Sequence, residues 1–554
     1  MTRRSFDIDG TLREAVALHR QGRLRDAERL YARVLKVMPD NFDALHLSGL
    51  VKAQSGRMGE AYRLMATALG INAQAADAWV NFANVLHALG RDAEALEALE
   101  RALQLRPGDP EILRLRGDTL IALGRAREAV EAFDRVLAAQ PRNGEALNGR
   151  GAARAALGKA HEALADFDAA LALAPDHPGA LYNRGRALLE LDRPHEALAS
   201  FERALRVAPA NAQAWNNRGR ALQALNRHAE AVASFDEAVA RDRRYADAYS
   251  NRALSRLALG DYARGFADYE WRWKRSGMSD PRGKYRAPLW LGEYPLAHRR
   301  VLLVAEQGLG DTLQFSRYAP LLARMGATVI MEVHAELKTL LEPLEGVAAV
   351  IARGEPLPAY DVFCPLGSLP LAFKTEATTI PADIPYLHAR DARLARWRPR
   401  LAALTGKRVA FAWAGNPRHA NDRNRSIDLA QLAPLFAVPG VSFVSIQREL
   451  RAGDAARLAD EPKVLHLGDA LEDMDDTAAV LALCDLLIAV DTSVAHLAGA
   501  MGRPLWVLLP FSPDWRWTAQ GERTPWYPQA RLFRQRAPGE WPDVIARVAQ
   551  ALAD

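Results

Sequence analysis

Residues 301–311 read VLLVAEQGLGD and lead into the stretch TLQFSRYAPLLARM. The apolar run at its start predicts a short buried strand, and the amphipathic spacing after it predicts a helix. Gly308 and Gly310 would form the tight turn between them, where glycine can take a positive φ and let a ligand approach the backbone. Asp311 stands at the mouth of the helix, where a carboxylate can cap free N–H groups. The stretch therefore predicts a ligand site at the carboxyl end of a parallel strand, although a simple helix cap explains Asp311 equally well.

The composition indicates a globular protein of several domains. The chain has 554 residues and 49% hydrophobic content, more than one core usually accommodates. Its 72 basic and 67 acidic residues leave a net charge of +5, too small to indicate nucleic acid or an anionic membrane as a partner. Cys364 and Cys484 lack CxxC spacing, which is typical of a reducing compartment and indicates no metal site. Without a leader-like stretch or a run of about 18 apolar residues, we expect a cytoplasmic protein with no membrane span.

The N-terminal half repeats itself every 34 residues, the length of the tetratricopeptide helix–turn–helix unit. Eight units run without insertion over residues 8–279. Each has a residue that tolerates left-handed φ at its turn: Gly22, Gly56, Gly90, Gly124, Gly158, Asp192, Asn226 and Gly260. Because no unit can bury its apolar face alone, stacking predicts an α-solenoid, a tetratricopeptide superhelix whose concave groove binds partners.

The C-terminal half predicts an α/β fold. Residues 280–300 are punctuated by proline and predict a linker. Beyond them, strand-like and helix-like segments alternate, which indicates parallel sheets. We expect two Rossmann-like units, at residues 301–400 and 401–554, that enclose a cleft. The strand candidates after the first are 328–334, 347–352, 360–365, 407–415, 441–447, 463–468, 485–491 and 504–510.

The strongest chemical pattern is LLIAVDTSVAHLAGAMGRP at residues 486–504. It places Asp491 and Thr492 at the carboxyl end of a strand and His496 in the first turns of the next helix. Backbone N–H groups, a hydroxyl and an imidazole would converge there, where a diphosphate could bind. A capped helix with a buried His496 is the alternative.

Two more loops come after strands of the second unit. The loop WAGNPRHANDRNRS, residues 413–426, contains Asn416 and Arg425 and is suited to anionic oxygens. The segment SIQRE contains Gln447 and Glu449, which could bind a ribose hydroxyl. For both loops a solvated polar surface is the alternative. The acid-rich EDMDD at residues 472–476 precedes a helix and is typical of an N-terminal charge cluster.

The strings GLGD and DTSVAHLAGA resemble the paired signatures of glycosyltransferase family 9, the heptosyltransferases, which have the GT-B fold. The resemblance covers about residues 301–554. Longer strings, among them WAGNPRHANDRNRSIDL and DWRW, are similar to those of bacterial tetratricopeptide proteins with a C-terminal family-9-like domain. Some of that group are implicated in flagellin glycosylation.

This resemblance implies roles for individual residues. It makes Asp311 the catalytic base and implies that Arg425 contacts phosphate and Glu449 binds ribose. The diphosphate contacts that it implies are Asp491, Thr492 and His496. Ser493 stands where the family usually has glycine, so either its hydroxyl joins the site or the donor differs.

The resemblance implies direct transfer of a sugar from a nucleotide-sugar to an acceptor hydroxyl. Asp311 would take the hydroxyl proton, and no cofactor is expected. The sequence has no D-x-D near a strand end, so a metal-independent reaction is expected. We expect a protein acceptor, with flagellin as one candidate, held in the groove of the repeats. A saccharide or lipid-linked acceptor is one alternative, and a scaffold or chaperone with a non-catalytic nucleotide-binding domain is another.

The sixth position of the last three repeats is asparagine: Asn183, Asn217 and Asn251. These amides would line the concave wall, where an amide can clamp an extended peptide backbone without reading its side chains. The O-GlcNAc transferases, which the architecture also resembles, use a similar asparagine ladder. Arginines fill the seventh position of the later repeats. They could also bind the acceptor, or they could pair with a column of acidic residues and so link the repeats.

Overall fold

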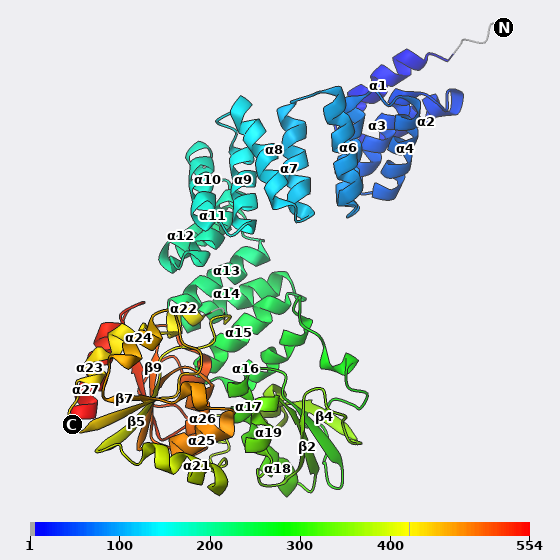
Figure 1. The fold of residues 1–554 in the computed structure, drawn as a ribbon. Helices are drawn as coiled ribbons and strands as arrows, with labels where there is room; N and C mark the ends of the chain where they lie inside the picture. The colour runs from blue at the N-terminus through cyan, green and yellow to red at the C-terminus, as the bar shows by residue number, and fades with distance from the viewer. Residues whose placement is uncertain (1–5, 420) are drawn as a thin grey trace, which may run out of the picture. The chain divides into compact units, whose positions relative to one another are not determined.

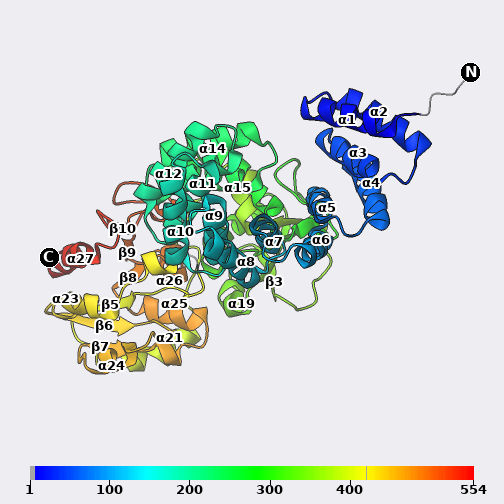
Figure 2. The same cartoon turned by 90° about the horizontal axis from the view of Figure 1, so that it is seen from above.

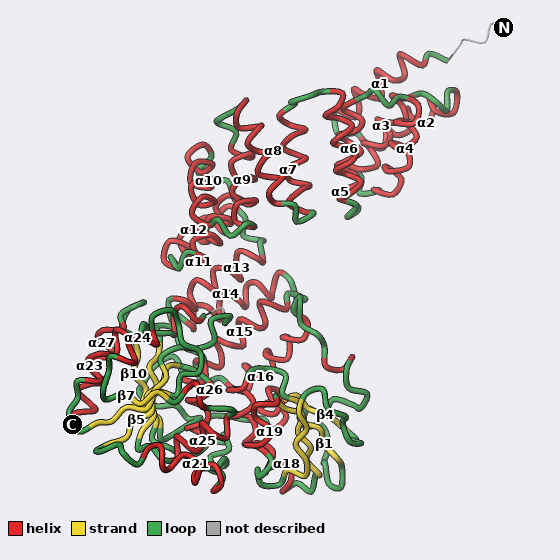
Figure 3. The backbone as a smooth tube through the Cα atoms, viewed as in Figure 1, coloured by secondary structure: helices red, strands yellow, loops and turns green. Residues whose placement is uncertain are grey.

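The computed structural model describes residues 6–419 and 421–554, which fall into two compact units divided between Ala210 and Asn211. The first unit is a stack of helix pairs, shown in red in Figure 3. Its helices are α1 (Ile8–Arg20), α2 (Leu24–Val37), α3 (Phe42–Gln54), α4 (Met58–Ile71), α5 (Ala76–Ala88), α6 (Asp92–Leu105), α7 (Pro110–Ala122), α8 (Ala126–Ala139), α9 (Gly144–Ala156), α10 (Ala160–Leu173), α11 (Pro178–Glu190) and α12 (Pro194–Val207).

The turns between paired helices confirm the predicted turn residues. Their glycines all have positive φ, from 72° to 81°, and Asp192 and Asn226 take the same conformation at 57° and 56°. The space between the helices is filled by large side chains such as the ring of Phe133. A β-carbon at Gly149 would lie 2.4 Å from Cζ of Phe133, so only glycine lets the helices approach so closely there. The repeat array is therefore fixed by its turns and its small-to-large packing.

The second unit begins with the last two repeats: α13 (Ala212–Ala224), α14 (His228–Arg241), α15 (Ala246–Ala258) and α16 (Tyr262–Tyr269). The sequence pattern places a boundary after residue 279, whereas the compact unit joins these repeats to the α/β part. The segment 280–300 packs onto that part, because Trp290 is buried and donates its backbone N–H to the carbonyl of Phe363 at 2.9 Å.

Two parallel sheets confirm the α/β prediction (Figure 1). The first has the order β3-β2-β1-β4 and the second β10-β9-β8-β5-β6-β7. The strands are β1 (Arg300–Val304), β2 (Thr328–Val333), β3 (Val347–Ala352), β4 (Val362–Pro365), β5 (Lys407–Ala412), β6 (Val441–Ser445), β7 (Val464–His466), β8 (Leu486–Val490), β9 (Leu505–Leu509) and β10 (Ala530–Arg534). Each predicted strand is present, most of them shorter at their ends, and β10 has no counterpart among the predictions.

The helices that connect and cover these strands are α17 (Leu309–Phe315), α18 (Ala319–Arg324), α19 (Ala335–Leu341), α20 (Leu369–Ala372), α21 (Asp391–Leu401), α22 (Asp422–Arg425), α23 (Ala433–Phe436), α24 (Asp454–Ala459), α25 (Met474–Ala482), α26 (Ser493–Ala500) and α27 (Trp541–Ala553). Figure 2 shows α21 and α25 packed together beside the six-stranded sheet. The strands β1 and β8 lie inside their sheets, so the turns after them, to α17 and α26, are held on rigid supports.

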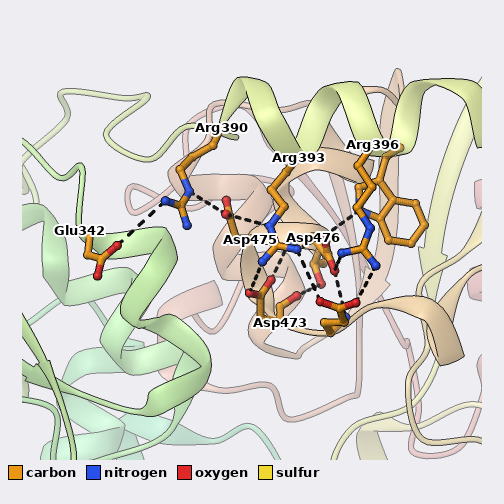
Figure 4. A network of polar contacts seen from close by, with 10 residues as sticks. Glu342, Arg390, Arg393, Arg396, Asp473, Asp475 and Asp476 are labelled. Carbon is orange, nitrogen blue, oxygen red and sulfur yellow. Dashed lines mark hydrogen bonds and ion pairs between the residues drawn. The ribbon is translucent and has the colours of Figure 1, made fainter. Parts of the chain in front are cut away.

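The acid-rich segment before α25 confirms the predicted helix N-terminal charge cluster. Asp473 caps α25 by accepting from the backbone N–H of Asp476 at 2.9 Å. The cluster is also paired across helices, because Arg393 and Arg396 of α21, and Arg390 just before that helix, point into it (Figure 4). These ion pairs thus join α21, which precedes β5, to α25, which precedes β8.

Candidate functional site

The turn between β1 and α17 is a capped helix start. The Asp311 carboxylate accepts from the backbone N–H of Gly308 at 3.0 Å, which confirms that Asp311 caps the helix. The expectation that Gly308 and Gly310 have positive φ is wrong: Gly308 has φ −75°, and Gly310 also lies outside the left-handed region. The need for glycine at 310 has another cause. A β-carbon there would lie 2.7 Å from Cδ2 of His496, so the turn passes directly against the imidazole ring.

This contact brings the two signature segments together, since α17 packs against α26. Asp311 and His496 lie 185 positions apart in the chain, yet they share one site between the two sheets. Arg516 completes the connection by forming an ion pair with the other oxygen of Asp311. It lies on a short turn after β9, in a segment where no sequence pattern predicts a role for this arginine.

His496 is neutral and oriented. Burial lowers its pKa well below the usual range, and the charges of Arg516, Arg317 and Arg425 act in the same direction. Its ring stacks on Trp517, with centroids 5.2 Å apart, and its Nδ1 lies 3.1 Å from the Tyr527 hydroxyl. Burial raises the pKa of Tyr527 well above its usual value, so the phenol stays protonated and can donate to Nδ1. When the phenol donates to Nδ1, the imidazole proton lies on Nε2, where it can donate to an acceptor oxygen.

Asp491, Thr492 and Ser493 form the turn into α26, as the sequence predicts. The Thr492 hydroxyl bonds back to the carbonyl of Val490 at 3.3 Å instead of capping the helix, and Ser493 is the first helical residue. Burial, with the neighbouring Asp514 carboxylate, raises the pKa of Asp491 to about 6. Its Oδ1 lies 4.0 Å from Nε2 of His496. The start of α26 therefore presents backbone N–H groups next to a neutral imidazole donor.

Arg425 is the residue of the 413–426 loop that reaches this turn. Its Nη1 donates to the carbonyl of Asp491 at 2.9 Å. Its guanidinium lies against Gly415, where a β-carbon would be 2.6 Å from Nη2, which explains the glycine in that loop. Within residues 6–419 and 421–554, its Nε is a buried donor with no hydrogen-bond partner. The Asp422 carboxylate lies 3.8 Å from this Nε, so Arg425 adds a partly compensated positive charge beside α26.

Among the other residues predicted to bind the donor, Asn416 and Gln447 have side-chain hydrogen bonds within their own loops and strand ends. Asn416 is exposed and accepts from the backbone N–H of Arg418 at 2.9 Å. The Gln447 side-chain oxygen is bonded to the N–H groups of Trp413 and Ala414, which favours a structural role at the end of β5. Glu449 is exposed, and its carbonyl accepts from the Gln447 amide at 3.2 Å.

The last two repeats hold both loops of the site, a feature that sequence analysis did not identify. Arg272, just after α16, pairs with Glu306 at 3.1 Å, and Tyr269 accepts a hydrogen bond from Gln307. These partners directly precede Gly308. On the other side, Ser512 donates to the carbonyl of Gln223 in α13 at 2.7 Å, close to the turn that carries Arg516. Repeats seven and eight are therefore part of the support of the site.

Two of the three asparagines of the sixth repeat position are bonded to the preceding repeat. Asn183 donates to Asn148 at 3.0 Å in the first unit, and Asn251 donates to Asn216 at 2.9 Å in the second. Asn217 is buried and accepts from Arg220 at 3.1 Å. Two of the amides thus form pairs between successive repeats, which uses part of their hydrogen-bonding capacity.

The arginines of the seventh position support the pairing alternative. Arg150 bonds to Asp134 at 2.7 Å, and Arg252 bonds to Asp236 at 2.7 Å, each across a repeat boundary. Arg252 also pairs with Asp268 at 2.7 Å. These residues link repeats together.

Neither a metal-ligand cluster nor a membrane-spanning helix is present in the described part of the chain. Over residues 6–419 and 421–554, no group of three or more His, Cys, Asp or Glu side chains is arranged to hold a metal ion. Over the same residues, every helix is too short or too polar to cross a membrane.

Comparisons with known proteins define the class. Models described as tetratricopeptide repeat match residues 12–74, 52–118, 93–153, 143–210, 182–243 and 218–281. The chain thus contains tetratricopeptide repeats over residues 12–281, followed by a C-terminal α/β part with parallel sheets.

The individual proteins that the chain is similar to share 29% sequence identity or less with it. The chain is similar to Protein FlbA of Caulobacter vibrioides, with 29% identity over 310 residues, 52% of this chain and 51% of that protein. It therefore spans about half the length of this relative. A tetratricopeptide repeat protein from Parabacteroides merdae is 20% identical, with a TM-score of 0.40 over 45% of this chain and 98% of that one. A thermophilic repeat protein of Thermus thermophilus is 25% identical, with a TM-score of 0.30 over 33% of this chain and 100% of that one.

Proposed function

We propose that the chain is a metal-independent glycosyltransferase that moves a sugar from a nucleotide-sugar to a protein acceptor bound by the repeats. The observation that carries this proposal is the meeting of two strand–helix turns from different sheets. One turn supplies Asp311, and the other supplies Asp491, Thr492 and His496. A ligand site at the carboxyl ends of strands in two facing α/β units is the arrangement expected of a GT-B enzyme, as the family-9 resemblance implies.

The turn before α26 has the chemistry of a diphosphate site. Helix N–H groups and the positive end of the helix dipole favour an anion there. Arg425 adds a fixed positive charge, and neutral His496 adds a hydrogen bond through Nε2. These groups could stabilise a departing nucleotide phosphate without a metal ion.

Asp311 faces this turn from the other side and is the candidate general base. Its carboxylate is 22% exposed, so an acceptor hydroxyl can reach it from solvent. A carboxylate that takes the acceptor proton as the hydroxyl attacks typically contributes about 10² to 10⁴ in rate. A non-catalytic scaffold is the second candidate, and it is favoured by the ion pair that occupies Asp311 with Arg516.

Incubation with a panel of nucleotide-sugars separates these two candidates. We expect slow hydrolysis of one donor, and the same rate in EDTA, because the phosphate would be held by α26, Arg425 and His496. The measurement is release of free nucleotide, with and without chelator. Stable donors throughout the panel would favour the scaffold. Activity lost in EDTA and restored by magnesium or manganese would show that the site depends on a metal.

The acceptor is predicted to contact the asparagines of the sixth repeat position. We expect the triple variant Asn183→Ala, Asn217→Ala and Asn251→Ala to hydrolyse donor at the wild-type rate but to lose at least about tenfold in transfer to protein, since each lost peptide hydrogen bond is worth about 0.5–1.5 kcal/mol. The two rates are measured side by side on the same preparation.

A matched control is available because two of these amides bond to asparagines on the preceding repeat. The double variant Asn148→Ala and Asn216→Ala removes those partners but leaves the sixth position intact. It should retain transfer. Equal losses in both variants would mean that the asparagines act only by joining repeats, and full transfer by the triple variant would place the acceptor elsewhere.

A further inference from the structure

Arg516 is a buried cation shared by three acceptors. Its Nε donates to the side-chain oxygen of Gln314, its Nη1 to Asp514 at 2.9 Å, and its Nη2 pairs with Asp311. Burial disfavours the charged form, but the carboxylates of Asp514 and Asp311 outweigh it and raise the pKa of Arg516. The guanidinium is therefore a permanent charge that connects the two α/β units.

The position of Arg516 is close to the proposed phosphate site. Its charge acts on both Asp491 and His496 at the start of α26. The amide nitrogen of Gln314, whose side chain has no exposed surface, finds no hydrogen-bond partner in the described part of the chain. A buried donor without an acceptor is costly, so an acceptor oxygen that reached this nitrogen would be bound favourably.

Two anions would then compete for one guanidinium. Arginine binds carboxylate and phosphate with the same planar pair of N–H groups, and a diphosphate carries more negative charge than a single carboxylate. The lone pair of Asp311 that Arg516 engages is not free to take a proton from a hydroxyl, and the ion pair opposes approach of the acceptor to that oxygen. Loss of that ion pair would release it.

We propose that Arg516 is a phosphate-responsive switch, which holds Asp311 in this structure and turns to a diphosphate bound at the start of α26. This inference rests on the proposed function, because it assigns the diphosphate to a nucleotide donor. The switch makes Asp311 available only when the donor site is filled, which would limit proton transfer to the loaded enzyme.

Calorimetric titration of the full chain with inorganic diphosphate tests the competition without requiring sugar transfer. Asp311→Asn should tighten binding about three- to tenfold, because it removes the competing anion. Arg516→Gln should weaken binding at least about tenfold. In the Arg516→Gln background, Asp311→Asn should change affinity less than about twofold.

The control distinguishes a switch from a general field effect. In an Arg425→Gln background, the gain from Asp311→Asn should persist, because Arg425 bonds to the Asp491 carbonyl and not to Asp311. If the Arg516→Gln variant melts early, Arg516→Lys replaces it. A lysine keeps the charge but cannot bridge two carboxylates with a planar fork, so the gain should again fall below about twofold.

Each result decides the inference. An equal gain with and without Arg516 would show that Asp311 acts only through its charge, and unchanged affinity in Asp311→Asn would show no competition; either result overturns the switch. No binding of diphosphate by the wild-type chain also overturns it. Donor turnover in that case would leave the proposed function intact, whereas diphosphate coupling without donor turnover would retain the switch and reject the transferase.

Discussion

Asp311→Asn should lower sugar transfer by at least about 100-fold while the chain remains folded. The amide has nearly the shape of the carboxylate and can still accept from the backbone N–H of Gly308, so the start of α17 is retained. It cannot take a proton from the acceptor. Transfer is measured at saturating donor and acceptor, together with donor hydrolysis and thermal melting.

Asp514→Asn is the matched control for this variant. Asp514 is the other carboxylate on Arg516, at 2.9 Å, but it lies on the turn before that arginine and outside the mouth of α17. Its loss should disturb Arg516 to a similar degree and leave most of the transfer rate. If Asp311→Asn keeps more than about a tenth of wild-type turnover, Asp311 is not the general base.

The sequence predicted this site as far as local patterns reach. Asp311 and His496 each lie at a strand–helix turn, and the periodicity around them is clear enough to place both. The residue that joins them could not be placed in this way. Arg516 stands in the irregular DWRW segment, and its pairing with Asp311 spans 205 positions. Its own neighbourhood therefore contains no pattern that predicts the contact.

The same limit explains the predictions that were wrong or remain open. The sequence predicts a positive φ at Gly308 and Gly310, because a positive φ is the usual local reason for glycine in a turn. The structure shows that Gly310 is required instead by the ring of His496, from a helix distant in the sequence. Gln447 lies just after a strand, as a ligand-binding residue would, but its oxygen is used by backbone N–H groups of the neighbouring strand end. The position of a residue in a strand predicts at which end of the sheet it lies. Its hydrogen-bond partners are determined by tertiary packing.

The support of the site by repeats seven and eight was also only partly predictable. In the degenerate eighth repeat, YEWRWKR (residues 269–275), Trp271 and Trp273 stand where other copies have small interface residues, a pattern that predicts docking of the array onto the part that follows. The structure confirms docking but assigns it to Arg272 and Tyr269 instead of the two tryptophans. Trp271 stacks on Tyr249 within the repeats, with centroids 3.8 Å apart. The composition of the eighth repeat thus predicts which segment docks, whereas only the contacts show which of its residues make the docking hydrogen bonds and ion pair.

Arg393→Ala should cause the largest loss of stability among single substitutions in the cluster at α21 and α25. Arg393 bonds to Asp473 at 2.9 Å and to Asp476 at 3.0 Å, and it lies 3.4 Å from Asp475 (Figure 4). The side chains of Asp475 and Asp476 have no exposed surface. Removal of one partner from a buried ion pair leaves uncompensated charge and costs about 3–5 kcal/mol. Because Arg393 itself is 22% exposed, and Asp475 and Asp476 would keep ion pairs with Arg390 and Arg396, we expect the lower end, about 3 kcal/mol.

The comparison with Arg396→Ala isolates burial as the cause, since both arginines lie on one face of α21. Arg396 is 41% exposed, and its closest partner, at 2.6 Å, is Glu472, which is 64% exposed. Its contact with the buried Asp476 is longer, at 3.5 Å, so its loss should cost about 1 kcal/mol, less than the loss of Arg393. Urea unfolding followed by circular dichroism of the full chain gives the two midpoints. Added salt should reduce the difference between wild type and Arg396→Ala by a larger fraction than the difference for Arg393→Ala, because salt screens exposed pairs more than buried ones. Equal destabilisation by the two variants would show that the buried aspartates gain nothing particular from Arg393, and that the helices are held by the packing of Trp397 and its neighbours.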